Sequence, residues 1–172
     1  MKVSINTAAV HYSAPSKGSV YLLCICSTGR CQNCRYVITV ATVVDTQLLI
    51  SPSRDIQSSV NSFQHWANIH GTLPCPVCQA QTEMERREVI DSVPDAFLLY
   101  LSRFAEDRSP INVDKVLVVK EQPYALNAVV LYQAYSTTTG HYTAHVNRHC
   151  QWFLTNDSVV SIHVRNSSLL VN

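Results

Sequence analysis

Two pairs of cysteines restrict the fold of this chain more than any other feature of its sequence. They are Cys31-Gln-Asn-Cys34 and Cys75-Pro-Val-Cys78, separated by residues 35–74. Each pair can place two thiolates on a tight turn, and two such turns supply the four sulfur ligands of a tetrahedral zinc site. Because four thiolates leave no open coordination position, the ion would be structural and would tie together two segments that are distant in sequence.

The residues around the second pair agree with this hypothesis, and other interpretations of the thiols stay open. Pro74 and Pro76 stiffen the turn that carries this pair. The alternatives are four unconnected thiols, one redox-active pair, or a site in which His65 or His70 replaces one thiolate. The double pattern favours structural zinc over these alternatives.

Three further cysteines lie outside the two pairs. Cys24 and Cys26 belong to the apolar stretch "VYLLCIC", where strand alternation sends both side chains to the same face. They are interpreted as small buried apolar residues, with a role as spare metal ligands as the alternative. Cys150 is expected within a strand. Since the N-terminus has no signal-peptide core, the thiols are expected to stay reduced, in an intracellular protein of the cytoplasm, the nucleus or both.

Most of the chain has the pattern of short β-strands. Alternating or continuous apolar runs bounded by turn residues predict about nine strands, including "RYVITVATVV", "QAQTEMERREVI", "VPDAFLLYLSRF" and "YALNAVVLYQAY". The segment "STGRCQNC" is expected to be a turn. The fold class predicted is α+β, mostly antiparallel β.

One segment has helical spacing instead. Val60, Phe63 and Ala67 recur at intervals of three and four residues, with Ser58 or Ser59 available as a cap and Gly71 as a stop. This pattern predicts an amphipathic helix of about three turns.

Net charge and the length of the apolar runs argue against two classes of partner, nucleic acids and membranes. The 172 residues suit one domain, and charged residues make up 15% of the chain with a net charge of +1. This near-neutral balance disfavours a protein that binds nucleic acid. The longest apolar runs are far shorter than the roughly 18 residues needed to cross a bilayer, so no membrane association is expected.

A histidine near the C-terminal end is a candidate for thiol-protease chemistry. Such chemistry needs a cysteine, a histidine that takes its proton, and a third side chain that orients the imidazole. His141 precedes the pair Asn156-Asp157 in a segment that fits a β-hairpin, which would bring the two polar ends together. Spacing alone is more typical of an ordinary surface hairpin with a histidine at one end.

Four motifs in order make the family identifiable. "VPDAFLLYLSRF", "YALNAVVLY", "GHYTAHV" and "WFLTNDSVV" follow the double CxxC pattern. Together they resemble the ubiquitin-specific protease (ubiquitin carboxyl-terminal hydrolase) family of papain-like deubiquitinases, over about residues 19–160. The resemblance implies that His141 is the general base, that Asn156 orients it, and that Asp157 assists in orientation or oxyanion support.

The resemblance also implies a division of the chain. Residues 1–18 form a leader whose structure the sequence does not specify, 19–165 form a partial catalytic domain, and 166–172 form a tail. Within the partial domain, a zinc-bearing fingers subdomain that grips ubiquitin covers about 19–90. The palm with the histidine covers about 91–165, and the thumb of the family is missing.

The nucleophile motif of the family is not found in this sequence. It is expected before the fingers, yet nothing ahead of Cys24 matches it, and neither Cys24 nor Cys26 has the surroundings that lower a thiol pKa. The chain is therefore a fragment or truncated product, an inactive relative, or one of two polypeptides that together make the enzyme. The predicted function is hydrolysis of the isopeptide bond after the C-terminal glycine of ubiquitin. The alternative is a catalytically inactive, zinc-stabilised ubiquitin-binding module.

Overall fold

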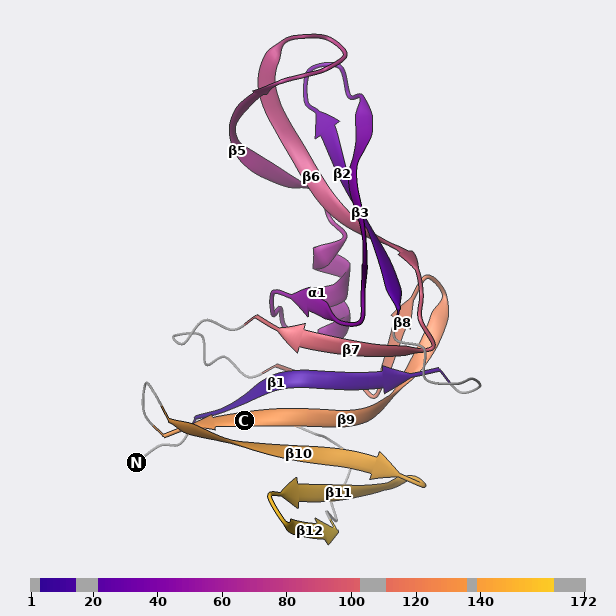
Figure 1. The fold of residues 1–172 in the computed structure, drawn as a ribbon, viewed down its shortest axis with the longest axis vertical. Coiled ribbons are helices and arrows are strands. Elements are labelled where there is room, and N and C mark those ends of the chain that lie inside the picture. The colour runs from indigo at the N-terminus through magenta and orange to yellow at the C-terminus, as the bar shows by residue number, and fades with distance from the viewer. Residues whose placement is uncertain (1–3, 15–21, 103–110, 136–138, 163–172) are drawn as a thin grey trace.

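The computed structural model describes residues 4–14, 22–102, 111–135 and 139–162, which form two β-sheets and one α-helix (Figure 1). Within these ranges, neighbouring strands pair antiparallel except for β4 and β7, which run parallel. The α+β, mostly antiparallel fold class is therefore confirmed. No helix in these ranges has the length and apolar character needed to span a membrane.

The larger sheet, called the base sheet below, has eight strands. Their order is β12-β11-β10-β9-β1-β7-β4, and β8 also pairs with β9. The strands are β1 (Ser4–Ser13), β4 (Leu48–Ile50), β7 (Ala96–Leu101), β8 (Val116–Val119), β9 (Gln122–Ala134), β10 (Gly140–Arg148), β11 (Gln151–Asn156) and β12 (Val159–Ile162).

The smaller sheet, called the arm sheet, has four strands in the order β3-β2-β6-β5. It projects away from the base sheet on the side of β7 (Figure 1). The strands are β2 (Leu23–Cys31), β3 (Val37–Asp45), β5 (Ala67–Pro74) and β6 (Gln81–Ser92). The strand patterns of residues 35–44 and 79–90 thus predicted β3 and β6 correctly.

The helix α1 (Ile56–Phe63) lies where the two sheets meet and is shorter than expected. Its N-cap is Asp55, whose carboxylate accepts a hydrogen bond from the Ser58 amide at 2.6 Å, so the predicted serine caps are wrong. The helix ends at Phe63, and residues 67–74 form β5 rather than a third turn. The predicted stop at Gly71 is therefore wrong as well, because pairing with β6 overrides the helical spacing.

Part of the expected leader is a central strand of the base sheet. Residues 4–13 form β1, which pairs with β7 on one side and β9 on the other. Val10 and Tyr12 alternate toward the core and are almost fully buried. The mixed polar composition of this segment hid that alternation. Residues 1–3 and 15–18, and the tail 166–172, lie outside the described residues.

Two other expectations about local structure are wrong. Residues 27–31 continue β2 instead of forming a turn, and the turn begins at Gln32. Cys150 lies in the turn between β10 and β11, not in a strand. The described residues contain twelve strands where about nine were expected, because β1 lies in the expected leader, β5 lies in the expected helix, and β4 is separate from β3.

The main hydrophobic core lies between the base sheet and α1, with the root of the arm sheet joining it. Nineteen buried residues form this cluster among the described ranges. Tyr12, Phe97 and Tyr124 are its largest members, and the Phe97 and Tyr124 rings meet edge to face at 4.8 Å. Leu23 of β2 and Ile90 of β6 belong to the same core, which therefore reaches the arm sheet at its base.

Candidate functional site

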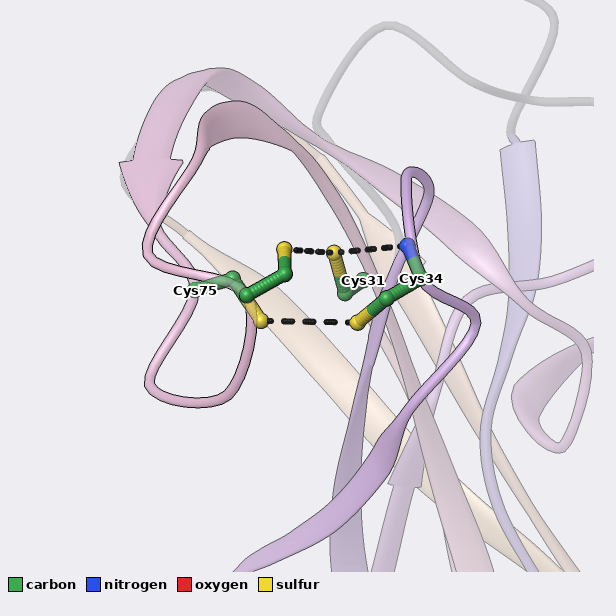
Figure 2. A group of neighbouring side chains, drawn as sticks. Cys31, Cys34 and Cys75 are labelled. Carbon is green, nitrogen blue, oxygen red and sulfur yellow. Dashed lines mark hydrogen bonds between the residues drawn. The ribbon is translucent and has the colours of Figure 1, made fainter.

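The four cysteines of the two CxxC pairs come together at the far end of the arm sheet. Cys31 ends β2 and Cys34 lies in the turn before β3, while Cys75 follows β5 and Cys78 lies in the turn before β6. Figure 2 shows the labelled side chains pointing toward one another from these two turns. All four sulfur atoms lie within 4.8 Å of one another, with Cys31 and Cys75 buried.

The spacing of the sulfurs fits a tetrahedral ion with thiolate ligands. The Sγ–Sγ distance is 3.8 Å between Cys31 and Cys78 and 3.7 Å between Cys34 and Cys75. For Zn–S bonds of about 2.3 Å, the edge of a regular tetrahedron is about 3.8 Å. The donor set and its dimensions are therefore compatible with structural zinc.

The two cysteine turns are built in the same way. In each, the residue after the second cysteine adopts a left-handed conformation: φ is 62° at Arg35 and 58° at Gln79. The amide of that residue donates to the carbonyl of the first cysteine at 2.9 Å in both turns. This shared geometry folds each CxxC segment back so that both of its sulfurs point to one centre.

Hydrogen bonds to sulfur prepare these thiols to ionise. The Cys34 amide donates to Cys31 Sγ and the Val77 amide donates to Cys75 Sγ, both at 3.4 Å. The Ala80 amide and the Asn33 side chain lower the pKa of Cys78 to about 6. Such donors stabilise the charged form of a thiol.

The four thiols cannot all ionise without a counterion. Although the Tyr36 amide acts to lower the pKa of Cys34, burial and the neighbouring thiols raise that pKa to about 11. Since like charges in one place disfavour each other, a divalent cation would resolve the conflict. The Asn33 side chain donates to Cys78 Sγ at 3.6 Å, a contact that the CxxC pattern did not reveal.

The second candidate site lies on the base sheet, where His141 and Asn156 meet. His141 is on β10 and Asn156 is the last residue of β11, and His141 Nε2 lies 2.5 Å from Asn156 Oδ1. An amide oxygen can only accept, so Nε2 is the donor of this contact, and in the neutral form of the imidazole Nδ1 then keeps the lone pair. The predicted contact between the two ends of the hairpin is therefore present.

The hairpin that makes this contact is set by a two-residue turn. His149 and Cys150 have φ values of 51° and 64°, which are the signs of a type I′ turn. In this hairpin Arg148 pairs with Gln151, and the pairing continues as far as Ala144 and Thr155. Asn156 is the next residue of β11, and this register puts its side chain on the same sheet face as His141.

Asp157 and Gly140, which lie next to this pair, have different surroundings. Asp157 is exposed and adopts φ of 51° in the turn before β12, while the imidazole donates its hydrogen bond to Asn156. Gly140 does not face open space, because a Cβ at this position would overlap the Tyr132 ring. Tyr132 packs against Tyr142 on the opposite sheet face from His141, with ring centroids 4.7 Å apart.

None of the seven cysteines lies beside His141. Six of them belong to the arm sheet or its turns. The seventh, Cys150, is in the turn at the other end of β10, nine residues away, which is about 30 Å along a strand. The part of the chain that the structure describes thus brings together a histidine and its orienting amide without a thiol next to them.

Comparison with models of known families gives a match that covers most of the chain. The family model for ubiquitin carboxyl-terminal hydrolase matches residues 18–170. The chain belongs to the ubiquitin carboxyl-terminal hydrolase family. This finding confirms the resemblance carried by the four ordered motifs. No curated protein matches the chain.

Solved structures support the fold of this ubiquitin carboxyl-terminal hydrolase chain. The yeast SAGA DUBm with an Sgf73 mutant matches with a TM-score of 0.72 and 22% identity, covering 85% of this chain and 37% of the other. The SAGA DUB module Ubp8/Sgf11/Sus1/Sgf73 bound to monoubiquitin matches with a TM-score of 0.65 and 18% identity, covering 84% and 37%. The chain thus spans well under half the length of the chains it matches.

Proposed function

We propose that this chain forms the fingers and the histidine-bearing part of the palm of a ubiquitin-specific thiol protease. The enzyme would hydrolyse the isopeptide bond after the C-terminal glycine of ubiquitin. The contact between His141 Nε2 and Asn156 Oδ1 carries the proposal. The family match over residues 18–170 supports the reaction class.

In this mechanism His141 is the general base. With Nε2–H held by Asn156, the free Nδ1 lone pair can take the proton of a cysteine thiol and later return it to the leaving amine. Asn156 fixes the tautomer and the ring orientation. Asp157 is proposed to assist in orientation or oxyanion support, from the turn that follows Asn156.

The nucleophile is proposed to come from outside these 172 residues. An upstream segment or a second polypeptide would place its cysteine against Nδ1 of His141. The position of Cys150 at the far end of the hairpin supports this proposal, as does the location of the other six cysteines in the arm.

The arm is proposed to act as the fingers that contact ubiquitin, within a division of the chain at about residues 19–90 and 91–165. Zinc held by Cys31, Cys34, Cys75 and Cys78 would fix the tip of the arm, and it would take no part in bond cleavage, because four thiolates leave no open position. The structural neighbour described as bound to monoubiquitin supports ubiquitin as the partner. Action in the cytoplasm, the nucleus or both fits this substrate.

A thiol-reactive ubiquitin probe tests the enzyme proposal. The 172-residue chain is expected to remain unlabelled, and labelling is expected once the missing cysteine segment is supplied in cis or in trans. In that assembly, His141→Ala should reduce hydrolysis of a ubiquitin C-terminal amide by at least about 10³-fold, since a triad member is lost. Tyr100→Ala, on an exposed part of β7, is the matched control and should retain activity.

A ubiquitin-binding module without chemistry is the second candidate function. This function is favoured because all seven cysteines lie away from His141. This function predicts ubiquitin binding by the chain that is unchanged in His141→Ala, with no hydrolysis in any assembly. Labelling of the 172-residue chain at one of its own cysteines would contradict both candidates.

A further inference from the structure

We infer that Cys24, Cys26 and Asp91 form a second, exchangeable zinc site at the root of the arm sheet. The ligand atoms of these three residues lie within 4.8 Å of one another. Two sulfurs and one carboxylate oxygen are a donor set that suits Zn²⁺ and is unlike the all-oxygen sites of Mg²⁺ and Ca²⁺. The inference is independent of the proposed hydrolysis.

A β-bulge brings the carboxylate to the two thiols. Cys24 and Cys26 are two residues apart on β2, so their side chains share one face. Ile25 of β2 pairs with Ile90 of β6, and Cys24 of β2 pairs with Ser92 of β6. Asp91 is therefore the extra residue of the bulge. Bulges re-aim a side chain away from the regular alternation, and here the re-aimed group is a metal ligand.

The site is open to solvent on one side. Cys24 and Cys26 are half-buried and Asp91 is exposed, contrary to the expectation of two buried apolar cysteines. Thr42 on β3 lies opposite Cys26, with its hydroxyl 3.5 Å from the Cys26 sulfur. Three protein ligands leave a fourth position for water, so an ion bound here would exchange more readily than one held by four thiolates.

The electrostatics around the three groups favour a cation. The two sulfurs and the carboxylate oxygen lie within 4.8 Å of one another. Because like charges in one place oppose each other, two thiolates and a carboxylate would need a divalent ion to lie together here. Lys120 lies close by, but its ammonium group donates to the backbone carbonyl of Asp91 and leaves the carboxylate available.

This site is distinct from the four-cysteine cluster. Cys26 and Cys31 are five residues apart on β2, which is about 17 Å along an extended strand. One ion cannot bridge sulfurs at that distance. The two clusters would therefore bind separate ions with different affinities.

Zinc binding to the reduced 172-residue chain, measured across buffers of rising free Zn²⁺, tests the inference. The wild-type chain should bind two ions in two separate steps. Cys24→Ser/Cys26→Ser should lose the weaker step and keep the tighter one. Because the tighter step needs Cys31 at the end of the same strand, its retention shows that the arm of the variant has folded.

Asp91→Asn provides a second variant that keeps both thiols. Removing one direct ligand should raise the free Zn²⁺ needed for the weaker step by at least about tenfold, the lower bound seen for loss of even an outer-shell partner. Cys150→Ser, at an exposed turn, is the matched control and should keep both steps unchanged. A wild-type chain with one step, a second step that survives the double serine variant, or an unchanged midpoint in Asp91→Asn would each overturn the inference.

Discussion

The arm sheet and the base sheet are held together by different means. Nineteen buried residues stabilise the base sheet and the root of the arm, whereas the buried cluster at the arm tip consists of Cys31, Cys75 and Met84. Burial of apolar surface contributes roughly 25 cal/mol per Å², so three residues contribute little. The difference indicates that the tip depends on its four thiols and the base does not.

Polar contacts stabilise the part of the arm sheet that lacks a hydrophobic core. The guanidinium groups of Arg30 and Arg87 lie over the Trp66 ring, with Cζ at 4.3 and 4.5 Å from the ring centroid. Arg30 also pairs with Glu85 at 2.7 Å, which lowers the pKa of Glu85. Partly exposed contacts of this kind stabilise by about 1 kcal/mol or less each, which is too little to replace a metal site.

The largest expected effect is the loss of one sulfur ligand at the tip. Cys75→Ser should unfold the arm tip while the base sheet stays folded, because structural zinc contributes about 10–16 kcal/mol in small zinc domains. Hydrogen exchange should show lost protection in residues 67–84 and retained protection in 124–131. Cys150→Ser is the control. Simultaneous loss of protection in both sheets would mean that they form one cooperative unit.

Truncation of a core side chain should destabilise the base sheet rather than the arm tip. Phe97→Ala removes the ring that packs against Tyr124 and should lower the free energy of unfolding by about 3–5 kcal/mol. Urea unfolding measures this change. Tyr100→Ala, on the same strand but 44% exposed, should cost much less. Equal costs for the two variants would contradict the placement of the core.

A smaller effect is expected next to the histidine site. Gly140→Ala places a methyl group against the Tyr132 ring and should destabilise the hairpin by about 1–3 kcal/mol. Tyr132→Ala in the same chain should relieve the overlap, so that the two substitutions together cost less than their sum. A double-mutant cycle of unfolding free energies tests this, and additive costs would show that the ring does not restrict position 140.

The smallest effect is expected at the helix between the two sheets. Asp55→Ala should cost about 1 kcal/mol through loss of the N-cap, whereas Asp55→Asn should retain most of the capping. Hydrogen bonds from Ser58 and the neighbouring Arg54 lower the pKa of Asp55 below its ordinary 3.8. Its stabilising contribution is therefore complete above that value and is lost as the pH falls through the lowered pKa.

The free energy of unfolding, measured over an acid titration, tests whether the stabilising contribution of Asp55 is lost at low pH. Below about pH 4, the wild-type chain should lose stability relative to Asp55→Asn, whose cap does not titrate. The difference between the two should be constant from pH 5 to pH 7. A difference that grows as the pH rises in that range would contradict the assignment.

Local patterns in the sequence predicted the two candidate sites more accurately than they predicted the elements around them. The CxxC spacing identified four thiols that meet, because two residues between cysteines fix the turn by themselves. The His141–Asn156 contact followed from the length of one hairpin. By contrast, β1 and the true end of α1 depend on partners far away in sequence, which no local pattern records.

The sequence by itself determined the thiol cluster, the hairpin contact and the family, since each rests on residues at short or fixed spacing. Only the tertiary structure decided that residues 4–13 lie in the middle of the base sheet and that Asp91 joins Cys24 and Cys26. Those placements come from strand pairing and from a one-residue bulge. A shift of one residue in a strand reverses the face of every side chain, and that register is set by the neighbouring strands.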